Sequence, residues 1–171
     1  MTAATPTRQP ARSSATRTLL LGAAASVAVL VLYACLFVGY AVLRSSLQIL
    51  STLSPGDGLF ATVVANAMSI GLAATSVTLL MAFLVAPLGA VTLLLASWVD
   101  RLLNPSLAPR PATWIGAGVA AIVFAAFAIL ILQVIRPYVA AFWPQGFLFW
   151  LGLPGLLFIG AMAWANRRLT E

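Results

Sequence analysis

The sequence predicts an all-α integral membrane protein with four transmembrane helices, a long second helix kinked at Pro87, and both termini in the cytoplasm. Two observations predict this class. Of the 171 residues, 63% are hydrophobic and only 7% are charged, whereas a soluble domain carries roughly a quarter charged residues. In addition, the 42 residues from 58 to 99 contain no charge. Such a chain cannot cover a water-facing surface, so we expect a lipid bilayer to surround it.

The chain begins with a basic segment and continues into a first apolar run. Residues 1–17, "MTAATPTRQPARSSATR", are rich in Ala, Thr, Ser and Pro and carry three arginines, which predicts a disordered cytoplasmic tail. The transmembrane domain then covers 18–171. Residues 18–43 form an uncharged run of 26 residues, longer than the apolar region of about 7–15 residues in a signal peptide. This run predicts a retained spanning helix.

The segment after the first span has a different pattern. In "RSSLQILSTLSPGDG", residues 44–58, leucines follow one another at helical spacing from Leu43 through Leu47 and Leu50 to Leu53. This spacing predicts a short amphipathic helix lying at the membrane surface. Pro and Gly in "SPGDG" then predict a turn.

The apolar stretch 59–99 allows three interpretations: one kinked helix, two helices with a buried turn, or a re-entrant loop. Cytoplasmic loops carry an excess of arginine and lysine. With one helix here, the spans are about 18–43, 60–98, 113–135 and 146–165, and the nine arginines divide seven to two. With two spans, they divide four to five. In the one-helix interpretation, the seven cytoplasmic arginines are Arg8, Arg12, Arg17, Arg101, Arg110, Arg167 and Arg168, and the two on the opposite side are Arg44 and Arg136.

Pro87 and Gly89 interrupt this second span within "MAFLVAPLGAVTLL". Proline lacks a backbone N–H and clashes with the preceding turn, so we expect a hinge or kink at these two residues, with the bend between residues 83 and 87. A re-entrant segment would need its unpaired backbone groups buried in protein, which four helices scarcely supply. The sequence therefore favours the kinked helix.

Aromatic residues near the span ends agree with this topology, because Trp and Tyr gather at membrane interfaces. The cytoplasmic boundary has Trp98, Trp114 and Trp164, and the opposite boundary has Tyr40, Tyr138 and Trp143. We expect a multi-pass protein of a bacterial inner membrane.

Several classes of chemistry lack the residues they need. The chain has no histidine, and its acidic residues are Asp57, Asp100 and Glu171, near predicted helix ends or the terminus. We therefore expect no catalytic, cofactor-binding or metal-binding site and no enzymatic activity. We expect Asp100 and Arg101 to be a solvated boundary pair, and Cys35, the only cysteine, to be a buried thiol. The net charge of +6 comes from arginines at helix ends, and we expect no nucleic-acid partner.

Small residues at four-residue spacing predict close helix packing. This packing lies either within the monomer or against a partner subunit. Polar residues within the spans, chiefly Asn66 and Gln133, indicate hydrogen bonds between helices; a polar permeation path is the alternative. The packing candidates are Ala74, Thr78, Ala82, Ala86 and Ala90 in the second helix, Ala117, Ala121 and Ala125 in the third, and Gly152 and Gly160 in the fourth.

One segment resembles a known family. Residues 66–97, "NAMSIGLAATSVTLLMAFLVAPLGAVTLLLAS", resemble the early core helix of binding-protein-dependent ABC permeases in their Asn start, their small and Thr residues and their Pro-Leu-Gly kink. The resemblance implies a divergent or partial permease subunit. Such permeases also carry a cytoplasmic Glu-Ala-Ala…Gly coupling segment, whereas the predicted cytoplasmic loop at 100–113 reads "DRLLNPSLAPRPAT".

The sequence favours a non-enzymatic function. We expect a small accessory or structural subunit that packs against a larger membrane complex, with the bilayer and other membrane subunits, or a second copy, as its partners. Abundant small-residue faces, short loops and spans without ionisable residues support this expectation. A transport component is the alternative.

Overall fold

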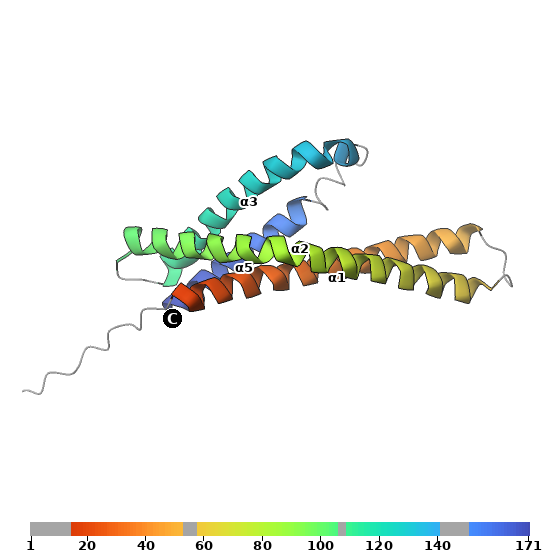
Figure 1. The fold of residues 1–171 in the computed structure, drawn as a ribbon, viewed down its shortest axis with the longest axis horizontal. Coiled ribbons are helices and arrows are strands. Elements are labelled where there is room, and N and C mark those ends of the chain that lie inside the picture. Colours follow the sequence, from red (N-terminus) through yellow and green to blue (C-terminus); the bar gives the residue numbers. More distant parts are fainter. Residues whose placement is uncertain (1–14, 53–57, 106–108, 141–150) are drawn as a thin grey trace, which may run out of the picture.

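The computed structural model describes residues 15–52, 58–105, 109–140 and 151–171, and every regular element in these ranges is helical (Figure 1). The elements are α1 (Ala15–Thr52), α2 (Leu59–Leu103), α3 (Pro109–Ala140) and α5 (Leu153–Thr170). This confirms the predicted all-helical architecture.

Three of the described helices are long and apolar enough to cross a membrane: α1 with 38 residues, α2 with 45 residues, and residues Ala112–Leu130 of α3. The 18 described residues of α5 include Arg167 and Arg168 near its end, and α5 is not among these three. The fourth span expected at 146–165 begins at residues outside the described part of the chain.

Helices α1 and α2 form a long antiparallel hairpin (Figure 1). Gly58 precedes α2 with a positive φ of 65°, a backbone conformation that glycine adopts without steric cost. The prediction of a separate amphipathic helix is wrong, because α1 runs without a break from Ala15 to Thr52. The segment 44–52 contains neither Gly nor Pro, so nothing in it stops the helix before the "SPGDG" sequence.

The second helix is continuous through Pro87, which lies on an exposed side of α2. Residues 59–103 form one helix rather than two, as the arginine distribution favours. A proline within an apolar helix costs one backbone hydrogen bond, and such helices tolerate this loss.

The core lies in one half of the hairpin. Helices α3 and α5 pack against each other and against the part of the hairpin that holds the buried residues of α1, between Thr18 and Ser26, and of α2, between Gly89 and Asp100 (Figure 1). The hydrophobic core consists of Ala25, Leu93, Ala120, Phe158, Met162 and Ala165. The other half of the hairpin extends past α3 and α5 (Figure 1).

Four helix ends meet at one end of the molecule, which we call the terminal end (Figure 1). They are the start of α1 at Ala15, the end of α2 at Leu103, the start of α3 at Pro109 and the end of α5 at Thr170. The opposite end of the hairpin, residues 44–52 of α1 and 59–67 of α2, is called the hairpin tip. The terminal end carries the exposed indoles of Trp98, Trp114 and Trp164.

Candidate functional site

Among the described glycines, the tightest surroundings lie where α1 contacts α2. A Cβ atom added to Gly89 would overlap the Ser26 hydroxyl and would come within 2.5 Å of the Gly22 carbonyl oxygen. A Cβ atom on Gly22 would lie 2.5 Å from the Gly89 carbonyl oxygen and 2.9 Å from the Leu93 Cβ. Gly89 was expected at a hinge, and its contacts show it at the crossing of two helices.

The small-residue stripe of α2 follows the same face. Its members are all half-buried, while the neighbouring Leu79, Leu80, Phe83 and Leu84 are exposed. Because α2 packs along α1, this stripe lies within the hairpin. The stripe consists of Ala74, Thr78, Ala82, Ala86 and Ala90.

The contact between α3 and α5 uses a face next to the expected one. Gly116 and Ala120 are buried, and a Cβ atom on Gly116 would lie 2.9 Å from the Asn166 Cβ. Ala117 and Ala121 are half-buried and Ala125 is exposed. Each helical residue turns the side-chain direction by about 100°, so the packing face begins one residue before the face inferred from the alanine spacing.

The glycines in and next to α5 differ in how closely other side chains approach them. Gly160 is exposed, and a Cβ atom there would meet no atom within 4 Å. Gly152 is half-buried directly before α5. The close approach belongs to Gly155, where a Cβ atom would lie 2.6 Å from the Phe124 ring. The Phe124 and Phe158 rings lie 6.1 Å apart between centroids and are tilted by 36°, so this glycine makes room for an aromatic pair.

Polar side chains within the apolar stretches find partners. Asn66 donates a hydrogen bond of 2.7 Å from Nδ2 to the Ser45 hydroxyl on α1. Gln133 is exposed on α3, so the structure does not bring Asn66 and Gln133 together. The hydroxyls of Thr78 and Thr92 donate to the carbonyl oxygens four residues before them, both at 2.7 Å. These bonds satisfy the hydroxyls within α2 and leave them poor candidates for a polar path.

Two expectations about single side chains are wrong. Cys35 is exposed on α1. Asp100 is buried, with 1% of its surface exposed, and its Oδ1 has no hydrogen-bond partner among the described residues. The expected solvated pair with Arg101 therefore has one buried member. The close approach of α2 to the other helices at the terminal end, which charge counting cannot reveal, buries this carboxyl.

Asn166 is the second buried polar side chain at the terminal end. It is 1% exposed and donates a 2.7 Å hydrogen bond from Nδ2 to the Ala112 carbonyl oxygen, which ties the end of α5 to the start of α3. Its own Oδ1 lacks a partner among the described residues. In the sequence, Asn166 directly follows the predicted span 146–165. This position alone does not distinguish a buried side chain that bonds another helix from an exposed one that caps its own helix.

The hairpin tip carries exposed apolar side chains on both helices. Leu47 is 58% exposed and Leu50 is 53% exposed on α1, and Phe60 is 82% exposed on α2. Val64 is also exposed. These four residues form the apolar tip surface, which no described helix covers.

Among the described residues, no three His, Cys, Asp or Glu side chains gather into a group that would hold a metal ion. Comparison of the chain with protein-family models, curated proteins and solved structures finds no match.

Proposed function

We propose that the chain is an accessory or structural subunit of a larger complex in a bacterial inner membrane, and that its hairpin tip docks onto another membrane protein. The proposal includes four spans, the last at 146–165, cytoplasmic termini, a bend at Pro87 and no catalytic machinery. Described arginine side chains support the orientation. Arg17, Arg101, Arg167 and Arg168 belong to the terminal end, and only Arg44 belongs to the tip.

The register of the hairpin fixes how far it extends. Ser45 bonds Asn66, and Gly22 lies against Gly89. Along this antiparallel register, the uncharged residues 18–43 of α1 lie beside residues 68–93 of α2. At 1.5 Å per residue, this part is about 39 Å long, enough to cross a hydrocarbon core of about 30 Å with tilt.

The tip continues beyond that part by nine residues on each helix, or about 13 Å. The headgroup region on each side of a bilayer is about 5–8 Å thick, so the end of the tip extends past it. Apolar side chains that face the lipid hydrocarbon are already shielded from water. At the level of the headgroups and beyond, the same side chains contact water unless another protein surface buries them. The apolar tip surface is therefore the single observation that carries the proposal, since contiguous exposed apolar patches mark interaction sites.

Purification from the native membrane in a mild detergent tests this function. We expect a stoichiometric membrane protein to copurify with the wild-type chain. The Phe60→Asn variant should lose that protein. A matched variant, Leu103→Asn, changes a side chain that is also exposed on α2 but lies at the terminal end, and it should retain the partner.

Two results would contradict the proposal. One is a wild-type chain that purifies alone as a monomer, and the other is a partner retained equally by both variants. If the wild-type chain copurifies only with itself and Phe60→Asn abolishes this self-association, the partner at the tip is a second copy of the chain and not a larger complex.

A further inference from the structure

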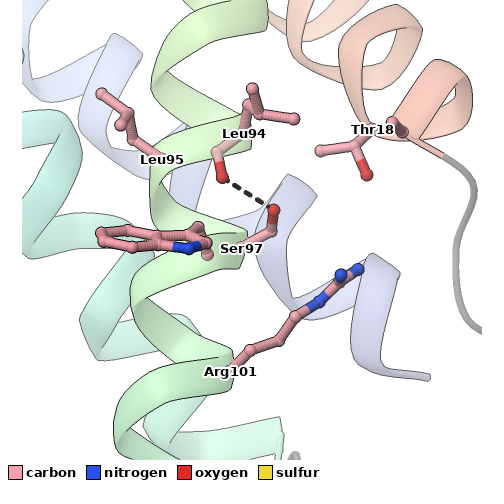
Figure 2. Close-up of a pocket in the computed structure, with 7 residues that line it drawn as sticks. Thr18, Leu94, Leu95, Ser97 and Arg101 are labelled. Carbon is pink, nitrogen blue, oxygen red and sulfur yellow. Dashed lines mark hydrogen bonds between the residues drawn. The ribbon is translucent and has the colours of Figure 1, made fainter.

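A groove lies at the terminal end, between α1 and α2. Its lining changes from apolar to charged along its length, whereas the apolar tip surface is apolar throughout. The groove has a volume of about 450 Å³ and lies between the start of α1 and the last three turns of α2. This volume falls within the range of about 300–1,000 Å³ that is usual for small-molecule sites. Figure 2 shows Thr18 of α1 facing residues 94–101 of α2.

The polarity changes in one direction along α2. Leu94 and Leu95 line the groove on the side of the membrane core, and Trp98 follows one turn later. Arg101 lines the groove on the side of the terminal end, seven residues or about 10 Å from Leu94. Its side chain extends from α2 toward the gap between α1 and α2 (Figure 2). An amphiphile with a negative head and an apolar tail has the same sequence of properties.

Ser97 adds a hydroxyl group to the groove, one helical turn before Arg101. Thr18 is almost fully buried at the α1 wall, and Ser97 donates its hydroxyl hydrogen to the Leu94 carbonyl oxygen at 2.8 Å (Figure 2). The oxygen of Ser97 can therefore accept a hydrogen bond from a headgroup hydroxyl. The Arg101 guanidinium presents several donors that suit a phosphate.

We propose that this groove binds an anionic phospholipid, with an acyl chain along Leu94, Leu95 and Trp98 and the phosphate at Arg101. Charge complementarity favours this occupant, because the cationic Arg101 lines the groove at the end opposite its apolar side chains. Arg167 and Arg168 at the end of α5 form ion pairs with Glu171. Basic pockets between spanning helices on the cytoplasmic side are known to bind anionic headgroups. The inference does not depend on whether the hairpin tip binds a partner.

Native mass spectrometry of the purified full-length chain in detergent tests the proposal. Phosphatidylglycerol and phosphatidylcholine with identical acyl chains are added in separate titrations, and sn-glycerol 3-phosphate is a third ligand without chains. We expect phosphatidylglycerol to bind more tightly than the other two. The Arg101→Gln variant should lose roughly fivefold in affinity for phosphatidylglycerol, the equivalent of about 1 kcal/mol per basic residue near an anionic surface.

The matched control is Arg168→Gln, which removes the same charge from the same end but outside the groove. It should leave the affinity for phosphatidylglycerol nearly unchanged. A second variant, Leu94→Trp, fills the apolar part without changing the charge and should also weaken binding. Circular dichroism confirms that each variant is helical. Equal losses in Arg101→Gln and Arg168→Gln, or equal binding of the two phospholipids, would overturn the proposal, and so would glycerol phosphate binding as tightly as phosphatidylglycerol.

Discussion

Gly89 of α2 lies so close to Ser26 of α1 that residue 89 has no room for a Cβ atom. The two helix backbones approach each other at this point, in the half of the hairpin that holds the core. Small residues that allow such an approach stabilise helix pairs through van der Waals packing along both backbones.

The first prediction concerns this crossing. Gly89→Ala should destabilise the protein by about 1–3 kcal/mol, the usual cost of overpacking a close-packed contact. Unfolding by increasing SDS in mixed micelles, followed by circular dichroism, measures this change. The control is Gly71→Ala on the same helix, where a Cβ atom would meet nothing within 4 Å. The control should be neutral or stabilising by up to about 1 kcal/mol. Equal effects of the two substitutions would contradict the close crossing.

The hydrogen bond between Asn66 and Ser45 sets the register at the far end of the hairpin. A double-mutant cycle of Asn66→Ala and Ser45→Ala should give a coupling energy of about 0.6 kcal/mol, the average for polar pairs between spanning helices. Ser76 provides the control, because its hydroxyl bonds the Leu72 carbonyl oxygen in its own helix. Ser76→Ala should therefore show no coupling to Asn66→Ala. A coupling energy of zero between Asn66 and Ser45 would argue against the register and thus against the calculated extent of the tip.

Replacement of Asp100 tests its burial. A buried oxygen without a hydrogen-bond partner costs about 1–3 kcal/mol, and more if the group is charged. Asp100→Asn keeps the shape and removes the charge, so we expect a higher free energy of unfolding at neutral pH. Glu171→Gln is the contrast, since it breaks the exposed pairs with Arg167 and Arg168, which are worth little. A loss of stability in Asp100→Asn would mean that the carboxylate has a partner that stabilises it.

Pro87→Ala distinguishes a structural subunit from the transport component implied by the permease resemblance. Alanine restores a backbone N–H at an exposed position of α2 and is favoured over proline by about 3 kcal/mol within a helix. For a structural subunit we expect a more stable protein with the same or somewhat altered assembly. A complex that assembles normally but loses solute flux in reconstituted vesicles would instead favour transport.

The general architecture follows from composition and periodicity. A single helix α2 is consistent with the charge-free run of 42 residues and with the arginine distribution. The length and the hydropathy of an apolar segment restrict where its helix can begin and end. The start of α1 is also close to the predicted start of the first span. These properties depend on local sequence alone.

The details of packing depend on contacts between distant residues, and the sequence predicts them less well. Alanine spacing on α3 indicated Ala117, Ala121 and Ala125, whereas Gly116 and Ala120 are buried, because the crossing with α5 selects the face. Asp100 is buried by helices that lie elsewhere in the sequence. The leucine spacing at the tip fits a separate surface helix and a continuation of α1 equally well, so it does not predict that α1 runs on to Thr52.

Site-specific photo-crosslinking tests the docking proposal most directly. A photoreactive amino acid replaces Phe60 at the tip or, as a control, Leu80, which is 67% exposed on α2 near the middle of the part that crosses the bilayer. After irradiation in native membranes, we predict a protein adduct of defined mass from position 60 and only lipid adducts from position 80. If position 60 yields no protein adduct, or if both positions yield the same products, the hairpin tip is not a docking surface.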